Sequence, residues 1–321
     1  MKILFLSSGY RGVYPSIEQS ILNAFQSHAI SICQNKCILE LDAYKLIQLC
    51  KKEKPTIIFT LLGYQLPQHF LMWAKKQQIN SICWLTEDPY MIDLSLQIAP
   101  YVSGLVTIEK NAWSHYSKKG YRTLHLPLGA DYSIFKSTHP QADKKSDVCL
   151  IGYPYPERVK LVSFLANELP IHITVAGNWY PHQLPANVKI ASLWVSSEEA
   201  VQYYASTKVV LNSYRSQNQA ENKNSTGLPG VSPNNRVFEV AGCKVCQISE
   251  AREDWHQWFN KEDIPLFSTK KQALDQIEEL LSNKQQRTLY ATNSYNTATS
   301  SHSYTHRINE LLTWLNQENL T

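Results

Sequence analysis

The feature that most constrains the fold is a repeated alternation between short apolar runs and amphipathic segments. Short runs rich in Val, Ile and Leu are typical of buried parallel strands. In the first part of the chain such runs predict strands at residues 3–7, 56–62, 81–86, 105–108 and 123–128. Helical periodicity predicts helices at residues 16–27, 39–52, 68–78, 91–102 and 112–119. Strands and helices that alternate in this way form β-α-β units on a mostly parallel sheet.

The alternation stops at residues 136–146, which are polar and aperiodic and predict a linker, and then begins again. The second round predicts strands at residues 147–152, 172–177, 188–191, 208–211, 245–248 and 265–267. It predicts helices at residues 157–169, 197–206, 235–242, 253–259 and 271–283, then a helical tail at 285–317 interrupted around 294–303. We therefore expect an α/β protein with two doubly wound, Rossmann-like domains. Their expected limits are 1–135 and 147–300, with a final segment, 301–321, that packs back on the first domain.

The composition is that of an ordinary globular protein. With 321 residues, 43% of them hydrophobic and 18% charged, the chain is long enough for two domains and is not disordered. The net charge of +4 comes without a long run of Lys or Arg, so the signature of a nucleic-acid-binding protein is weak and a small anionic ligand fits the charge at least as well. Seven cysteines, mostly in apolar runs, predict a reducing compartment. Because no run has the length of a signal peptide or a membrane span, we expect a cytoplasmic protein without an integral membrane segment.

The most informative motif is the segment 232–249, SPNNRVFEVAGCKVCQIS, which combines a short predicted helix with the strand that follows it. Asn234 or Asn235 can cap this helix, whose free N–H groups and positive dipole end would then face a phosphate. Arg236 adds a planar, forked donor for phosphate oxygens. Glu239, one turn further on, can accept hydrogen bonds from the paired hydroxyl groups of a sugar. A nucleotide-sugar requires all three of these features.

The same segment resembles the C-terminal donor-site motif of GT-B glycosyltransferases, roughly Arg-x-Phe-Glu-x-x-x-Cys-Gly, and is most similar to that of the CgeB-like spore-maturation glycosyltransferases. In that family the glutamate is expected to hold the ribose of the donor, a role that the resemblance gives to Glu239. The chain departs from the motif at one point, because Lys244 stands where a small residue follows the cysteine, and Gly242 precedes Cys243. The resemblance implies a GT-B fold, with two Rossmann-like domains facing a central cleft, and a hexosyltransferase-like activity.

Two glycine-containing turns of the predicted C-terminal domain extend the resemblance. Gly152 and Arg158 match an element of the family in which the arginine lies near the donor phosphates, although Arg158 can equally be a surface arginine paired with a carboxylate. Gly177 and Trp179 match a turn that ends the next strand. A base can stack on Trp179 or be recognised by the backbone there, and the alternative is a packed aromatic turn.

The predicted N-terminal domain carries a second motif, Trp84-Leu-Thr-Glu-Asp-Pro-Tyr90, which resembles the Glu-Asp-Pro element of CgeB-like proteins. Glu87 and Asp88 follow a strand directly, so one of them can orient or deprotonate an acceptor hydroxyl group. The alternative role for Asp88 is to cap the next turn. Gly12 ends the loop Ser-Ser-Gly-Tyr-Arg-Gly, which in GT-B enzymes faces the cleft near the transferred sugar. This loop is not a G-x-G-x-x-G motif, so a nicotinamide enzyme is disfavoured.

Neither a metal ion nor a cofactor is expected. The Asp-x-Asp motif that holds a divalent ion in the other large fold of glycosyltransferases does not occur in the sequence. The histidines are scattered, and Cys243 and Cys246 lack the second pair that a zinc site requires. A helix dipole together with Arg or Lys side chains would therefore stabilise the leaving diphosphate.

The sequence favours a metal-independent glycosyltransferase that moves a sugar from a nucleotide-diphosphate sugar to an acceptor hydroxyl group, and the resemblance implies retention of configuration. The acceptor stays open among a polymer, a protein, a metabolite and a modified nucleic acid. One alternative is a non-hydrolysing nucleotide-sugar epimerase, which would isomerise a sugar without any acceptor. The other is a catalytically silent nucleotide- or sugar-binding module, whose biological activity would survive replacement of Glu87 and Glu239 by alanine.

Overall fold

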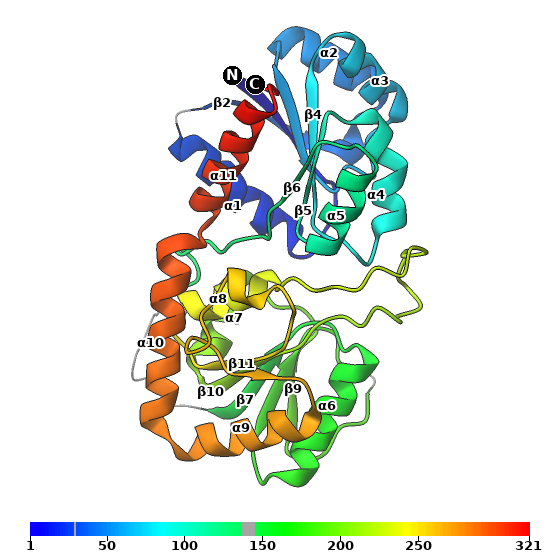
Figure 1. The fold of residues 1–321 in the computed structure, drawn as a ribbon. Helices are drawn as coiled ribbons and strands as arrows, with labels where there is room; N and C mark the ends of the chain where they lie inside the picture. Colours follow the sequence, from blue (N-terminus) through cyan, green and yellow to red (C-terminus); the bar gives the residue numbers. More distant parts are fainter. Residues whose placement is uncertain (29, 137–144, 181) are drawn as a thin grey trace. The chain divides into compact units, whose positions relative to one another are not determined.

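The computed structural model describes residues 1–28, 30–136, 145–180 and 182–321, and this chain divides into two compact units. Unit 1 consists of Met1–Leu128, Ala220–Ser232 and Tyr304–Thr321, and unit 2 of Gly129–Gln219 and Pro233–Ser303. Each unit contains a six-stranded parallel sheet with helices on both faces (Figure 1). The predicted α/β fold with two Rossmann-like halves is therefore confirmed.

The limits of the units differ from the predicted domain limits at three places. Residues 129–135, expected in the N-terminal domain, lie in unit 2, and Ala220–Ser232, expected in the C-terminal domain, lies in unit 1. Residues 301–303, expected in the final segment, also lie in unit 2. Most of the predicted linker, residues 137–144, lies outside the described residues. Its last residue, Ser146, is already the first residue of a strand.

Unit 1 has the strand order β2-β1-β3-β4-β5-β6, with every neighbouring pair parallel. Its strands are β1 (Lys2–Ser7), β2 (Ser31–Cys37), β3 (Ile57–Leu61), β4 (Asn80–Leu85), β5 (Gly104–Thr107) and β6 (Thr123–His125). Its helices are α1 (Tyr14–Ser27), α2 (Ala43–Glu53), α3 (Gln68–Lys76), α4 (Ile92–Ile98), α5 (Lys110–Lys118) and α11 (Tyr304–Gln317), with 3-10 turns η1 (Ile38–Glu40) and η2 (Ala99–Tyr101). Strand β2 is absent from the predicted set.

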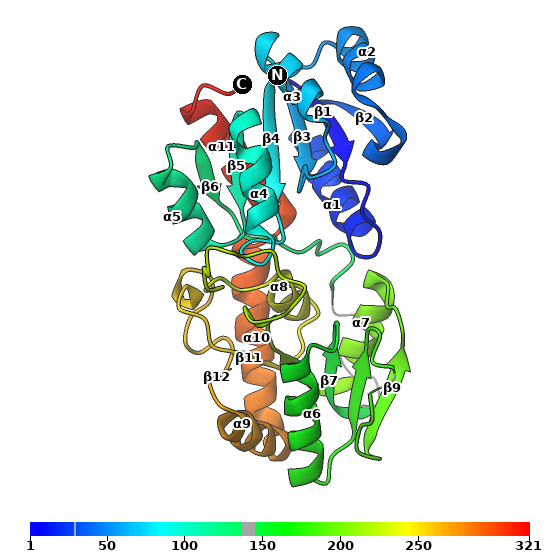
Figure 2. The same ribbon diagram turned by 90° about the vertical axis from the view of Figure 1, so that its right-hand side faces the viewer.

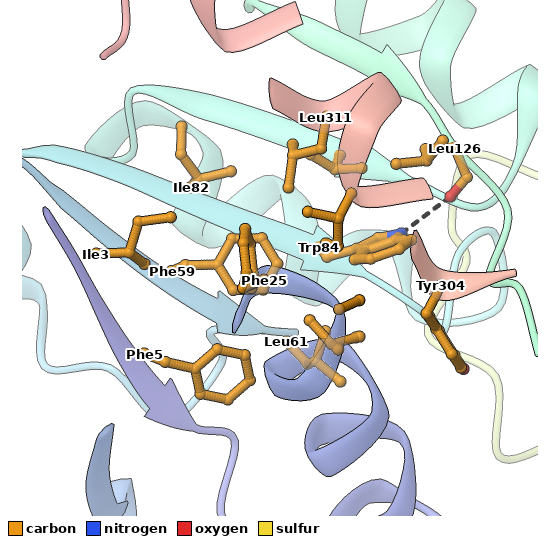
Figure 3. Packing of buried hydrophobic residues seen from close by; sticks show 14 of the residues in the cluster. Ile3, Phe5, Phe25, Phe59, Leu61, Ile82, Trp84, Leu126, Tyr304 and Leu311 are labelled. Carbon is orange, nitrogen blue, oxygen red and sulfur yellow. Dashed lines mark hydrogen bonds between the residues drawn. The ribbon is translucent and has the colours of Figure 1, made fainter. Parts of the chain in front are cut away.

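The inner strands of unit 1, β1, β3, β4 and β5, are buried on both faces, which explains their continuous apolar runs. Ile3 and Phe5 of β1 point to one core and Leu4 and Leu6 to the other, as the two-residue period of a strand requires. In the first core the ring of Phe59 packs edge-on against those of Phe25, at 5.2 Å, and Trp84, at 6.4 Å (Figure 3). The second core is closed by α2, α3, α4 and α5.

Helix α11 completes the first core, although it comes from the far end of the chain. Its apolar stripe, which includes Ile308, Leu311 and Trp314, lies in the same buried cluster as Ile21 and Phe25 of α1. Leu311 lies beside the sheet in Figure 3. Unit 1 therefore needs the last residues of the chain to bury one face of its sheet.

Unit 2 has the strand order β12-β11-β10-β7-β8-β9, again parallel throughout. Its strands are β7 (Ser146–Ile151), β8 (Ile173–Ala176), β9 (Val188–Ser192), β10 (Thr207–Asn212), β11 (Gln247–Glu250) and β12 (Leu266–Phe267). Its helices are α6 (Pro156–Glu168), α7 (Ser197–Ala205), α8 (Asn235–Gly242), α9 (Lys270–Ser282) and α10 (Lys284–Ser301), with a 3-10 turn η3 (Trp255–Gln257). The helix predicted at residues 253–259 is only this short turn.

Helix α10 is continuous through most of the stretch where the sequence predicts an interruption. It packs against α8 and α9 (Figure 2), and it buries Ala291, Ser294 and Ala298. The break before α11 is confined to His302 and Ser303. Burial of these small residues thus outweighs the low helix propensity of the neighbouring Ser, Thr and Asn residues.

The turn after α8 explains the departure from the family motif. Lys244 adopts the left-handed conformation, with φ of 55°, so the sharp turn into β11 forms without a glycine there. Gly242 serves another purpose, because a Cβ on it would lie 2.5 Å from the carbonyl oxygen of Phe135 and 2.6 Å from the ring of Tyr132. Within the described residues, no helix is both long enough and apolar enough to cross a membrane.

Candidate active site

Two glycines bring the ends of neighbouring strands of unit 2 into contact. Gly152 follows β7 and Gly177 follows β8, and their φ values are 143° and 111°. A Cβ on Gly177 would lie 2.8 Å from the carbonyl oxygen of Gly152, so the backbones can approach only because no side chain intervenes. Trp179 fixes the same turn, because its Nε1 donates to the carbonyl oxygens of Gly152, at 2.9 Å, and Ala176, at 3.2 Å.

Trp179 does not present its ring to a ligand. The side chain is completely buried in the core of unit 2. The predicted stacking of a base on this indole therefore does not fit the structure, and the alternative, a packed aromatic turn, does. The physical reason is that the indole N–H finds two backbone acceptors on the inner side of the turn.

Two arginines from different helices approach Gly152. A Cβ on Gly152 would lie 2.9 Å from Nη1 of Arg158, on α6, and 2.9 Å from Nη2 of Arg236, on α8. Guanidinium groups stay positively charged at any physiological pH, so two of them at one point repel each other unless an anion lies between or beside them. Gly152, Arg158 and Arg236, three predicted site residues, thus meet at the carboxyl edge of the sheet.

Arg158 is a buried residue with a fixed position. Its Nε donates to Oγ of Ser213 at 3.1 Å and its Nη2 to the carbonyl oxygen of Ser213 at 2.6 Å. Its Nη1 donates to the carbonyl oxygen of Tyr153 at 2.9 Å, and the guanidinium carbon lies 5.0 Å from the centre of the Tyr155 ring. The alternative interpretation of Arg158 as a surface arginine is therefore wrong.

The N-terminus of α8 differs from the prediction. Asn234 is the N-cap residue, but no side-chain hydrogen bond caps the described helix. Its Nδ2 instead donates to Oδ1 of Asn212 at 3.2 Å, and Nδ2 of Asn235 donates to Oε1 of Glu239 at 2.6 Å. The predicted capping by either asparagine is therefore wrong, because the amides are oriented by these bonds from their nitrogens and no side-chain oxygen caps the helix. The first N–H groups of α8 are left without an asparagine oxygen as acceptor, which preserves the anion-binding property of the helix end.

Glu239 lies one turn further along α8, on the side of Asn235. Burial raises the pKa of its carboxyl group, while Arg236 and the hydrogen bond from Asn235 oppose that rise. A carboxyl group that is half-buried and holds one amide donor retains acceptor capacity on its other oxygen. Its geometry is compatible with the predicted binding of two sugar hydroxyl groups.

The pair Glu87 and Asp88 follows β4 in unit 1, and its two members lie in different surroundings. Asp88 is 1% exposed and accepts hydrogen bonds from Ser95, at 2.8 Å, Thr107, at 2.7 Å, and Tyr116, at 3.0 Å. These partners show that Asp88 organises buried hydroxyl groups rather than capping the next turn. Glu87 is half-buried and accepts a hydrogen bond from the Tyr14 hydroxyl group at 2.7 Å. Of the two, Glu87 is the one that a ligand can reach.

Asp88 should make the stability of the protein depend on pH. Burial raises the pKa of its carboxyl group to about 6. Between about pH 4 and pH 6 the folded protein therefore holds a proton that the unfolded chain has released, so stability falls as the pH rises through this range. Relative to Asp88→Asn, the wild-type free energy of unfolding should fall by roughly 2.5 kcal/mol from pH 4 to pH 7. Urea unfolding at each pH measures this difference, and parallel curves for the two proteins would contradict it.

Gly12, the remaining predicted residue, lies in an exposed turn with φ of 76°, two residues before α1. It belongs to unit 1, as do Glu87 and Asp88, whereas the other predicted site residues belong to unit 2. Within the described part of the chain, no group of three or more His, Cys, Asp or Glu side chains could hold a metal ion.

Sequence reasoning missed the role of the polar loop that precedes α8. Its last part, Ala220–Ser232, which we call the strap, belongs to unit 1. The Glu109 carboxylate accepts hydrogen bonds from the backbone N–H groups of Val231, at 3.0 Å, and Ser232, at 3.1 Å. Asp93 accepts hydrogen bonds from the backbone N–H group of Ser225, at 2.9 Å, and from its hydroxyl group, at 2.8 Å. The only available signal was the position of Glu109 just after β5.

Solved structures of other proteins show which fold the chain has. The chain aligns with sucrose-phosphate synthase from Thermosynechococcus elongatus with a TM-score of 0.68 and 10% identity, over 98% of this chain and 99% of that one. It aligns with Anabaena HepE in complex with UDP-glucose with a TM-score of 0.67 and 13% identity, over 99% of this chain and 100% of that one. For T4 phage BGT in complex with its UDP-glucose substrate the TM-score is 0.64 and the identity 12%, over 100% of this chain and 99% of that one. The predicted GT-B fold is confirmed.

Sequence comparison gives the family. Residues 158–313 match the family model described as glycosyl transferase-like. The chain is 31% identical over 262 residues to spore protein CgeB of Bacillus subtilis (strain 168), which covers 78% of this chain and 80% of that protein. The protein belongs to the CgeB-like family and is a glycosyltransferase.

Proposed function

We propose that the protein transfers a sugar from a nucleoside-diphosphate sugar to an acceptor hydroxyl group, and that it does so without a divalent metal ion. The observation that carries this proposal is the approach of Arg158 and Arg236 to Gly152, at the carboxyl edge of the unit 2 sheet. Two guanidinium groups beside a helix N-terminus can balance the charge of a diphosphate. The structures of HepE and BGT, which share the fold, contain UDP-glucose, and this supports a uridine nucleotide as the first donor to test.

In this proposal the donor is held by residues of unit 2. Arg236 and the first N–H groups of α8 bind the diphosphate, and Arg158 contributes its charge from a more buried position. Glu239 accepts hydrogen bonds from the two ribose hydroxyl groups. The glycosidic C–O bond breaks, its electron pair leaves with the diphosphate oxygen, and the arginines stabilise the negative charge that develops there.

Glu87 is the residue of unit 1 that we propose binds and activates the acceptor hydroxyl group. It takes the proton of the acceptor hydroxyl group as the oxygen of that group forms the new bond to the anomeric carbon, and the nucleoside diphosphate leaves as an anion. The Tyr14 hydroxyl group, 2.7 Å from Oε1 of Glu87, keeps the carboxylate in place. We further propose that the transfer retains the anomeric configuration, in line with the family resemblance. The anomeric proton coupling of the product, observed by NMR during turnover, decides between retention and inversion.

The first experiment is a thermal-stability screen of the purified protein with UDP, GDP, ADP, CDP and dTDP and their glucose conjugates, with and without EDTA. A ligand present at 100 times its Kd should add about 2.7 kcal/mol to the free energy of unfolding. We expect one nucleotide to raise the melting temperature, with no effect of EDTA and no response in Glu239→Ala. If EDTA abolishes the shift, metal independence is wrong. If no nucleotide gives a shift, the donor proposal is wrong.

A further inference from the structure

We propose that Asn212 and Ser213, the residues at which β10 ends, are positioning residues that hold Arg236 and Arg158 toward the donor diphosphate. This inference rests on the proposed function and adds to it the residues that fix the two arginines. Both lie in the core of unit 2, with exposed fractions of 0% and 5%. Neither belongs to the motifs that the sequence singles out.

Asn212 binds one of the two terminal nitrogens of Arg236. Oδ1 of Asn212 accepts a hydrogen bond from Nη1 of Arg236 at 3.0 Å and another from Nδ2 of Asn234 at 3.2 Å. An arginine can only donate, so the oxygen of the Asn212 amide must face it. The amide nitrogen then donates to Oγ of Ser249 at 3.0 Å, which fixes the side chain from the other side. With Nη1 engaged in this way, Nη2 is the nitrogen that lies at Gly152.

Ser213 holds Arg158 from two directions. Its hydroxyl group accepts from Nε at 3.1 Å and its carbonyl oxygen accepts from Nη2 at 2.6 Å. The third nitrogen, Nη1, donates to the carbonyl oxygen of Tyr153 at 2.9 Å and approaches Gly152. Two consecutive residues at the end of β10 thus bind nitrogens of both arginines, and a further nitrogen of each arginine lies near Gly152.

This arrangement has a functional reading because arginine side chains lose much conformational freedom when they bind an anion. Guanidinium groups already held by neutral acceptors have lost that freedom before the ligand arrives, and their charge is not cancelled. A carboxylate at position 212 would hold Arg236 equally well but would cancel its charge. Asparagine is therefore the residue type that orients Arg236 and keeps it available for phosphate.

The test compares binding of UDP, inorganic pyrophosphate and uridine by NMR titration to the wild type, Asn212→Asp and Ser213→Ala. In Asn212→Asp we expect UDP and pyrophosphate to bind about 10-fold or more weakly, because the new carboxylate competes for Arg236, and uridine to bind unchanged. Ser213→Ala should bind UDP several-fold more weakly, and Ser213→Thr, which keeps the hydroxyl group, should restore binding. Asn309→Asp, on an exposed position of α11, is the control for the added charge.

The outcomes separate this inference from the function on which it rests. If the wild type binds UDP and both variants bind it equally well, the inference is wrong and the proposed function stands. The inference is also wrong if UDP and uridine weaken together, since that indicates a general structural role. If Asn212→Asp does not fold, Ser213→Ala and Ser213→Thr decide. Wild-type protein that binds neither UDP nor pyrophosphate overturns the inference and the proposed donor together.

Discussion

Replacement of Arg236 by alanine should weaken UDP binding by about 10- to 100-fold and lower glycosyl transfer at least as much, because a charge-assisted hydrogen bond to phosphate is lost. The fold should survive, since the side chain is only half-buried and its contact with Asn212 is a single hydrogen bond at 3.0 Å. Isothermal titration with UDP and initial rates at several donor concentrations measure the two effects. Arg236→Lys should fall between wild type and alanine, because lysine keeps the charge but not the planar pair of donors.

The control for Arg236→Ala is Arg122→Ala, which removes an exposed arginine of unit 1 whose Nε lies 3.6 Å from Glu318. That variant should bind UDP as the wild type does. Arg158→Ala is a poor substitute, because Arg158 is buried and its loss leaves the acceptors at Ser213 and Tyr153 without their donor. If Arg236→Ala binds UDP with wild-type affinity, the diphosphate does not lie at Gly152.

The second large effect is expected for Glu87→Gln, which should lower the rate of transfer by about 10²- to 10⁴-fold while leaving UDP affinity unchanged. Glutamine has the same shape and can still accept the hydrogen bond from Tyr14, so the local structure should persist. What it loses is the negative charge that polarises the acceptor hydroxyl group. Steady-state rates together with UDP titration separate the two quantities.

Two further variants sharpen the Glu87 experiment. Glu40→Gln removes an exposed carboxylate in η1 and should leave the rate of transfer unchanged. Asp88→Asn should affect stability more than chemistry, because Asp88 is 1% exposed and has three hydroxyl partners. A larger loss of activity in Asp88→Asn than in Glu87→Gln would reverse the roles that we assign to the two carboxylates.

Much of the fold follows from hydrophobic patterns. Strands such as β3 and β4 are buried on both faces, so they appear in the sequence as unbroken apolar runs. Strand β2, Ser-Ile-Cys-Gln-Asn-Lys-Cys, was missed because it is an edge strand paired only with β1 among the described strands, and an edge tolerates polar residues. The predicted break in α10 was wrong because it relied on the low helix propensity of the local residues. Packing against α8 and α9 outweighs that propensity.

The candidate site was predictable where a charged residue lies near the start of a helix that follows a strand, because such a position favours ligand binding. Arg158 and Arg236 were found because they stand in the first turns of α6 and α8, helices that follow strands of unit 2, and Glu239 lies one turn further along α8. The prediction that Trp179 stacks on a base was wrong, because the sequence does not show that the indole N–H donates to two buried carbonyl oxygens. Asn212 and Ser213 were overlooked since their importance depends on which arginine each one contacts. Such pairings arise from tertiary structure and leave no periodic trace.

The strap has a consequence for how this enzyme can be dissected. Within the chain as described, the polypeptide passes between the two units at residues 128–129, 219–220, 232–233 and 303–304, so neither unit is one continuous stretch of sequence. A fragment ending at residue 135 would lack both Ala220–Ser232 and α11, and the face of its sheet that α11 buries would be open to water. A chimaera that takes unit 2 from a relative must therefore exchange two separate segments, Gly129–Gln219 and Pro233–Ser303, and keep the segment between them from the original chain.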